Sequence, residues 1–291
     1  MEAEKKPTVL IGVPSYDGFI HAKLYEELDA LVRYSKENGV EVFTQGYLLC
    51  QVAIGSLLPM NRRNLAEAVF EIEADYLLTI DADSADIPPD ALVRLAAHKK
   101  DLVGAVVFTK SPPHVPCFGD RLDPKDKIIT FAVDFEPDKL LKVDGIGLGF
   151  TLISSSLLKG CIQQNPRHEL FACSERVGED WGFCQLLQYF GYEAYVDTSL
   201  VIGHRGSYIY GSWDADLYIE EIRDLRAKGS STLQAIAAIE AKYGRGFLQR
   251  KVERTYGFDA KRFKQAQLDR KEKEGVSPGL DFGGHEEVGE V

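Results

Sequence analysis

The stretch that most constrains the fold of this chain is residues 76–84, with the sequence YLLTIDADS. Its largely apolar, strand-favouring residues run directly into two carboxylates, Asp81 and Asp83, one residue apart. A short apolar run bounded by polar residues is typical of a buried strand in a parallel sheet. Open α/β sheets bind ligands at the carboxyl edge of their strands. The stretch therefore predicts an α/β fold in which Asp81 and Asp83 lie at a ligand-binding edge.

Two carboxylates at this edge need a compensating partner, because burying an unpaired carboxylate costs too much free energy. Exposure to water, contact with basic side chains or a bound divalent cation would each satisfy them. A cation held there would also bridge to a diphosphate.

Strand and helix patterns alternate through the first part of the chain. Residues 8–13 and 40–43 have strand patterns, and residues 21–34 between them repeat apolar side chains at helical spacing. A strand, a helix and a strand in this order form a right-handed parallel unit. A helix is predicted over residues 61–70 and a further buried strand over residues 102–108. These elements predict a mixed, mostly parallel sheet flanked by helices.

Two local patterns lead to more specific predictions. Turn residues at 136–138 within residues 127–144 predict an antiparallel hairpin. Asp86, ahead of two prolines, is predicted to cap a helix over residues 90–98 and not to bind a ligand.

The character of the chain changes near residue 212, where charged amphipathic helices are predicted over residues 214–228 and 231–255. We therefore expect an α/β domain at 7–206, a helical extension at 207–274 and a disordered, glycine-rich tail at 275–291. The helical extension is the segment that we expect to join copies of the chain in a homo-oligomer.

Composition excludes several classes of protein. The formal net charge of -11 argues against a general nucleic-acid binder, since phosphate neutralisation needs a basic face. The five cysteines lack CxxC spacing, which argues against a zinc site and a disulfide framework. The first residues lead directly into a strand, and no apolar run approaches the roughly 18 residues of a membrane span. We expect a cytoplasmic protein without a transmembrane segment.

Charged side chains at three other places are candidates for the same site. Lys110 lies in a basic loop after the strand at 102–108. Arg62 and Arg63 lie in the first turn of a predicted helix, where a cation opposes the helix dipole and so either points away or binds an anion. Glu179 or Asp180, at the start of another helix, would suit a general base that takes a proton from a hydroxyl.

Three glycines, Gly145, Gly147 and Gly149, alternate before an apolar strand. They are not a dinucleotide-binding fingerprint, because that motif follows a strand, opens a helix and has different spacing. We expect them to let another part of the chain or a ligand approach closely.

Six motifs in a fixed order carry a family resemblance: Val13-Pro14, Arg63-Asn64, TIDAD at 79–83, DGIGLGF at 144–150, GEDW at 178–181 and Gly203-His204. Taken together, over roughly residues 7–206, the chain resembles a GT-A-fold glycosyltransferase. It is similar to family 2 and to related compact enzymes of phages and archaeal viruses.

The resemblance implies a Rossmann-like GT-A fold and hexosyltransferase activity. The donor would be a UDP- or GDP-linked sugar, and the acceptor a glycan, a protein or a small molecule. Asp81 and Asp83 would lie beside the donor and bind Mn²⁺ or Mg²⁺, with Asp83 the more direct ligand and His204 a third. In inverting members of the family, the general base corresponds to Asp180. Whether this chain inverts or retains the configuration of the sugar stays open.

The resemblance also implies which residues contact the nucleotide sugar: Pro14, Ser15, Tyr16, Arg63, Asp81, Ala82, Lys110 and Gly147. Residues 147–150 would in addition border the acceptor site.

Three other classes remain as alternatives. A haloacid-dehalogenase-type phosphatase also has Asp-x-Asp after a strand, but its motif normally lies on the first strand and continues to Thr or Val where this chain has Ala85. A nucleotidyltransferase would have a glycine-rich basic loop near the first strand to bind a triphosphate, which this sequence lacks. A non-catalytic module that binds a nucleotide sugar or a glycan is the third.

Overall fold

A computed structural model describes residues 5–46, 48–122, 129–164, 170–173, 177–206, 209–210 and 212–243 of the 291-residue chain. These residues all belong to one compact unit. The predicted tail at 275–291 and the last part of the helix predicted over 231–255 lie outside the described residues.

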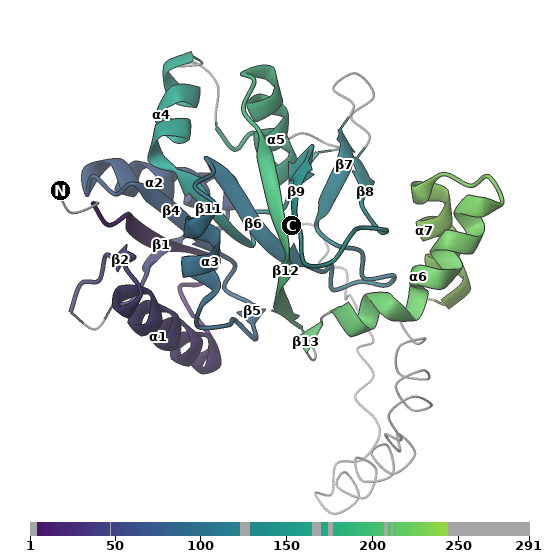
Figure 1. Cartoon of the computed structure of the whole chain (residues 1–291), viewed down its shortest axis with the longest axis horizontal. Helices are drawn as coiled ribbons and strands as arrows, with labels where there is room; N and C mark the ends of the chain where they lie inside the picture. Colours follow the sequence, from purple (N-terminus) through teal and green to yellow (C-terminus); the bar gives the residue numbers. More distant parts are fainter. Residues whose placement is uncertain are drawn as a thin grey trace, which may run out of the picture. The chain divides into compact units, whose positions relative to one another are not determined.

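The helices alternate with strands for most of the chain (Figure 1). The helices are α1 (Ala22–Glu37), α2 (Leu58–Glu71), α3 (Ala91–Ala97), α4 (Ser155–Gln164), α5 (Glu179–Tyr189), α6 (Ser212–Ala227) and α7 (Thr232–Tyr243). The strands are β1 (Thr8–Ser15), β2 (Glu41–Val42), β3 (Gln51–Ile54), β4 (Tyr76–Ile80), β5 (Ser84–Ala85), β6 (Leu102–Val107), β7 (Phe118–Leu122), β8 (Ile129–Phe131), β9 (Leu140–Val143), β10 (Gly145–Ile146), β11 (Phe150–Ser154), β12 (Ala194–Arg205) and β13 (Ile209–Tyr210).

The main sheet has the strand order β13-β12-β6-β11-β4-β1-β2, with β3 paired to β1 and with β5 and β9 paired to β12. Strands β1, β2, β3, β4, β6 and β12 run in one direction, while β11 runs antiparallel between β4 and β6. A second, small sheet has the order β10-β7-β8. The predicted α/β class with a mixed, mostly parallel sheet flanked by helices is confirmed.

Alternation along the strands divides the hydrophobic core into two layers, one on each face of the sheet. In β1, Val9 and Ile11 pack into the layer that contains the apolar side of α1 and α3, whereas Leu10 packs into the other layer. That other layer contains the apolar sides of α2, α4 and α5, which lie on the opposite side of the sheet in Figure 1. Helices on both faces explain why the strands are apolar on both sides.

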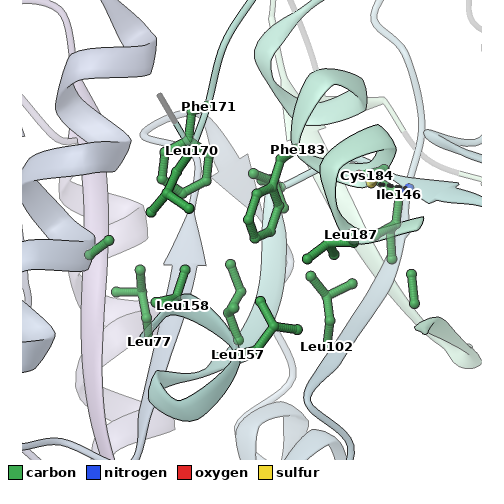
Figure 2. Close-up of a cluster of buried hydrophobic side chains, with 14 of the residues drawn as sticks. Leu77, Leu102, Ile146, Leu157, Leu158, Leu170, Phe171, Phe183, Cys184 and Leu187 are labelled. Carbon is green, nitrogen blue, oxygen red and sulfur yellow. Dashed lines mark hydrogen bonds between the residues drawn. The ribbon is translucent and has the colours of Figure 1, made fainter. Parts of the chain in front are cut away.

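The layer beneath α4 and α5 fixes the position of α5 (Figure 2). Phe183 and Leu187 of α5 converge there with Leu157 of α4 and with strand residues Leu77 and Leu102, and all five side chains are buried. Burying an aliphatic or aromatic side chain of this kind stabilises the fold by roughly 1.5–3 kcal/mol. The amino end of α5, which carries the predicted acids, therefore projects from a rigid support.

The hairpin predicted over residues 127–144 is wrong. Strand β8 pairs with β7 in the small sheet, whereas β9 pairs with the first half of β12 in the main sheet. The turn signal at residues 136–138 marks a change of direction, but which strands pair is decided by contacts distant in the sequence.

The prediction that Asp86 caps a helix is also wrong. The residue before α3 is Asp90, and Asp86 has a left-handed backbone with φ of 54°. The two prolines favour extended backbone before them, so the helix begins only after them. Strand β3 was not predicted at all, because its four residues have no distinct pattern.

The start of the helical extension contacts the rest of the compact unit. The Tyr218 ring of α6 lies 5.9 Å from the His114 ring, and Arg223 forms a 2.7 Å ion pair with Asp134. Among the described residues, no helix is long and apolar enough to cross a membrane.

Candidate functional site

The acidic pair lies in a tight turn directly after β4. The backbone amide of Asp81 donates to the carbonyl of Gly149 at 2.9 Å, and the amide of Ser84 donates to the carbonyl of Asp81 at 2.9 Å. Strand β5 then pairs with β12, which places Ser84 opposite His204. The turn is thus held between the start of β11 and the end of β12, at the carboxyl edge of the sheet.

Asp83 has two basic partners. Its Oδ1 lies 3.1 Å from Nε2 of His204, and its Oδ2 contacts the ammonium of Lys110. Burial alone would raise the pKa of Asp83, but the hydrogen bonds and charges of His204 and Lys110 outweigh burial and lower this pKa to about 2. Asp83 is therefore a carboxylate at neutral pH, and Lys110 reaches the acidic pair.

The ring of His204 is oriented by the chain. Its Nδ1 lies 3.0 Å from the carbonyl oxygen of Phe108, which can only accept, so Nδ1 carries a proton. In the neutral ring, Nε2 then presents a lone pair, which would be available to a divalent cation held by the site. In the protonated ring, Nε2 donates to Asp83 instead.

A candidate metal-ligand set lies at this position. One ligand atom from each of Asp81, Asp83 and His204 can be chosen so that all three atoms lie within 4.8 Å of one another. Two carboxylate oxygens and one imidazole nitrogen suit a hard divalent cation such as Mn²⁺, which accepts both ligand types. The three residues fit the metal site that the resemblance implies.

Beside this set lies a buried arginine, Arg62 of α2, whose side chain is 1% exposed. Its Nη2 lies 3.1 Å from Oδ1 of Asp81 and 3.4 Å from Oδ1 of Asp180, and its Nε lies 3.4 Å from Oε1 of Glu179. Its Nη1 donates to the carbonyl of Leu148 at 3.2 Å. Burial lowers the pKa of Arg62, but the three acids outweigh burial and raise it.

Asp180 occupies the most unusual electrostatic environment of the site. Burial raises its pKa, the charge of Arg62 opposes burial, and the charges of Glu179 and Asp81 add to it, so that the pKa reaches about 7. Brønsted behaviour favours a general acid or base with a pKa near the working pH. The pKa of Asp180 therefore suits a group that transfers a proton at neutral pH.

The alternating glycines allow other parts of the chain to approach closely. A Cβ on Gly149 would lie 2.8 Å from Oδ2 of Asp81, and one on Gly147 would lie 3.1 Å from Cβ of Cys117. A Cβ on Gly145 would lie 2.0 Å from the ring of Trp181. The expected close approach is thus made by side chains of this chain, one of them an acid of the site.

Arg63 is not part of this cluster. It lies on the exposed surface of α2, where its Nε is 3.0 Å from Oε1 of Glu67 one turn later. The preceding residue, Arg62, is the arginine that contacts the acids. That Arg63 faces the nucleotide stays a prediction.

The residues predicted to line the nucleoside pocket lie at the end of β1. Pro14 and Ser15 are the last two residues of β1, and the Ser15 hydroxyl accepts from the amide of Gly18 at 3.0 Å. Tyr16 follows with 78% of its surface exposed. Ala82 lies between the two acids in the turn after β4.

Asn61 is a buried polar residue that the sequence patterns did not single out. Its amide donates to the carbonyl of Gly55 at 2.9 Å and to that of Ser15 at 3.3 Å. It therefore ties the end of β1 to the loop before α2. Asn61 and Arg62 both lie about one helical turn before Leu65, so they share its buried face of α2. This spacing is the sequence signal that identifies the face of α2 toward the site.

No protein-family model matches this chain, and no curated protein matches it either. Among solved structures, A197 from STIV is 18% identical with a TM-score of 0.44, over 69% of this chain and 86% of that chain. CMP:2-keto-3-deoxy-manno-octonic acid synthetase is 11% identical with a TM-score of 0.40, over 77% of this chain and 100% of that chain. The 2-C-methyl-D-erythritol 4-phosphate cytidylyltransferase from Thermus thermophilus is 15% identical with a TM-score of 0.37, over 72% of this chain and 96% of that chain. At these identities and TM-scores, the similarities assign no activity to this chain.

Proposed function

We propose that this protein is a metal-dependent glycosyltransferase of the GT-A type, which moves a sugar from a nucleoside diphosphate to an acceptor hydroxyl. One observation carries the proposal: a carboxyl group with a pKa of about 7, Asp180, is joined through the buried Arg62 to Asp81, which belongs to a candidate cation site. An inverting sugar transfer from a diphosphate uses two functions side by side, stabilisation of the leaving group and activation of the acceptor.

The first function is stabilisation of the leaving group. Asp81, Asp83 and His204 would hold Mn²⁺ or Mg²⁺, which when bound neutralises the charge of the departing diphosphate. Lys110, which contacts Asp83, would supply a further positive charge at the same edge.

The second function is activation of the acceptor. The acceptor oxygen forms a bond to the anomeric carbon of the sugar while the bond from that carbon to the diphosphate oxygen breaks. Asp180 accepts the proton that the acceptor hydroxyl loses, if the reaction inverts the anomeric configuration. Gly147, where an added Cβ would lie 3.6 Å from Asp180 Oδ2, borders the place of the acceptor in this proposal.

The nucleoside would lie at the end of β1, where the exposed ring of Tyr16 provides a stacking surface. Uracil or guanine is the base that the family resemblance implies. A non-catalytic binding module would bind the same donor but leave it intact, and a phosphatase would release phosphate without an acceptor.

The test is thermal unfolding with UDP, GDP, CDP, CTP and the common sugar conjugates of the diphosphates, each with and without Mn²⁺. A ligand that binds only the native state raises the midpoint by mass action. We expect a metal-dependent rise with one diphosphate and its sugar conjugate. A rise confined to CTP would instead favour a nucleotidyltransferase.

Asp83→Asn should remove the metal-dependent rise and the transfer activity, because it deletes a ligand charge. Asp86→Asn is the matched control. Asp86 lies three residues after Asp83 and is exposed, and asparagine also tolerates its left-handed backbone. A full metal-dependent rise in Asp83→Asn would remove this residue from the metal site. Donor binding without turnover under any acceptor would favour the non-catalytic module.

A further inference from the structure

The acidic pair is neutralised by two cations of the chain that differ in how firmly they are held. Arg62 forms an ion pair with Asp81, and its side chain is 1% exposed. It also contacts Glu179 and the carbonyl of Leu148. Lys110 forms an ion pair with Asp83, and its side chain is 37% exposed. Arg62 cannot leave without uncovering several buried groups, whereas Lys110 can leave for solvent or for a ligand.

The loop that carries Lys110 stays in place if its side chain moves. The amide of Thr109 donates to the carbonyl of Val115 at 3.0 Å, and the amide of His114 donates to the carbonyl of Ser111 at 2.9 Å. Nδ1 of His114 also donates to the carbonyl of Thr109 at 2.8 Å. The backbone is thus fixed on both sides of Lys110, and its flexible four-carbon stem alone can redirect the ammonium.

The ammonium of Lys110 and a divalent cation would use the same carboxylate. Lys110 contacts Oδ2 of Asp83, while Oδ1 of Asp83 faces Nε2 of His204, another member of the metal-ligand set. Two positive charges on one carboxylate repel each other. A metal ion that binds Asp83 therefore favours the conformers of Lys110 that point elsewhere.

We propose that Lys110 is an exchangeable internal cation: it pairs with Asp83 when the site holds no metal and is displaced onto the diphosphate when the metal binds. This inference rests on the metal site of the proposed function. It makes metal and nucleotide bind cooperatively, because each ligand favours the conformer of Lys110 that the other requires. Thermodynamic linkage makes this coupling equal in both directions.

The test is calorimetric titration of the full-length protein and of Lys110→Met with Mn²⁺ alone, with UDP or GDP alone, and with both. Without its internal competitor, Lys110→Met should bind Mn²⁺ about fivefold more tightly than the wild type, the ratio expected for a strong surface ion pair. The factor by which Mn²⁺ increases nucleotide affinity should fall by about the same ratio. Lys142→Met is the matched control, because Lys142 forms an exposed ion pair with Glu193 and should leave Mn²⁺ affinity unchanged.

Each other outcome overturns the inference. Tighter Mn²⁺ binding with unchanged coupling would show only the loss of a nearby charge, and equal tightening in Lys142→Met would show a general charge effect. Equal Mn²⁺ affinity in Lys110→Met and the wild type would refute the exchange while the metal site stands. If neither protein binds Mn²⁺, the metal site of the proposed function fails as well.

Discussion

Replacing Arg62 by methionine is the perturbation for which the structure gives the clearest expectation. The change keeps an unbranched apolar side chain in the buried space but removes the only guanidinium described as contacting Asp81, Glu179 and Asp180. The three carboxyl groups then lie together with no compensating charge from α2. We expect Arg62→Met to fold less stably and to lose transfer activity.

The magnitude follows from the burial of the acids. Removing one partner of a fully buried ion pair costs about 3–5 kcal/mol, because an uncompensated charge stays behind. The acids here are 30%, 16% and 25% exposed, so water compensates part of the loss. We therefore expect about 3 kcal/mol at pH 8, which lowers the urea midpoint by about 1 M for an m-value of about 3 kcal/mol/M.

The loss should also depend on pH. Without Arg62, the folded acids bind protons more readily than in the unfolded chain, so the stability of the variant falls as pH rises. The difference from the wild type should be larger at pH 8 than at pH 5. Urea unfolding followed by circular dichroism at the two pH values measures both quantities.

The neighbouring residue supplies the control. Arg63→Met removes an identical side chain from the same turn of α2, but its ion pair with Glu67 is exposed, so it should cost no more than about 0.5 kcal/mol. Arg62→Lys, which keeps the charge, should lie between the two. Equal midpoints for Arg62→Met and Arg63→Met, or a loss that does not change with pH, would refute the role given to Arg62.

Two further predictions concern the acids of the site. Asp180→Asn should abolish transfer but keep donor binding, and its stability relative to the wild type should rise between about pH 4 and pH 7. The pKa of Asp180 is raised to about 7, so the wild type loses stability as pH rises through this range, whereas asparagine does not titrate. We expect a gain of roughly 2 kcal/mol at pH 8, half of the full linkage value, since the side chain is 25% exposed; urea midpoints that do not diverge with pH would contradict this. Gly149→Ala should weaken Mn²⁺ binding about tenfold and cost about 1–3 kcal/mol, because its Cβ would lie 2.8 Å from Asp81 Oδ2. Gly178→Ala, whose Cβ meets nothing within 4 Å, is the control in calorimetry, and equal Mn²⁺ affinity in the two variants would contradict the assignment.

Much of the α/β framework could be predicted from the sequence, because each element depends on a local pattern. The apolar run before Asp81 has side chains that suit burial on both faces of a sheet, and it forms strand β4, which ends in the acidic turn. Alternation of strands and helices then brings the ends of β4, β6 and β12 to one edge. Asp83, Lys110 and His204 follow these strand ends or lie within them, and the structure places them in contact.

The sequence also contains the signal that Arg62, and not Arg63, contacts the acids. Arg62 precedes Leu65, Ala66 and Val69 by three, four and seven residues, the spacing of one helical face, and all four residues are buried. Arg63 shares its face with Glu67 and is exposed. A phase comparison along α2 separates the two arginines, whereas the family motif points to Arg63.

The sequence by itself determined the class of fold, the strand-borne acidic pair and the types of residue available for chemistry, because periodicity and strand termination are local properties. Only the tertiary structure decided that β11 runs antiparallel between β4 and β6, and that β8 and β9 separate into different sheets. It alone also joined Arg62 to Glu179, 117 residues away, and buried Asp180 near Glu179 and Asp81, which raises its pKa. Strand partners and buried charge networks depend on which distant surfaces share one core, and a local pattern contains no record of that choice.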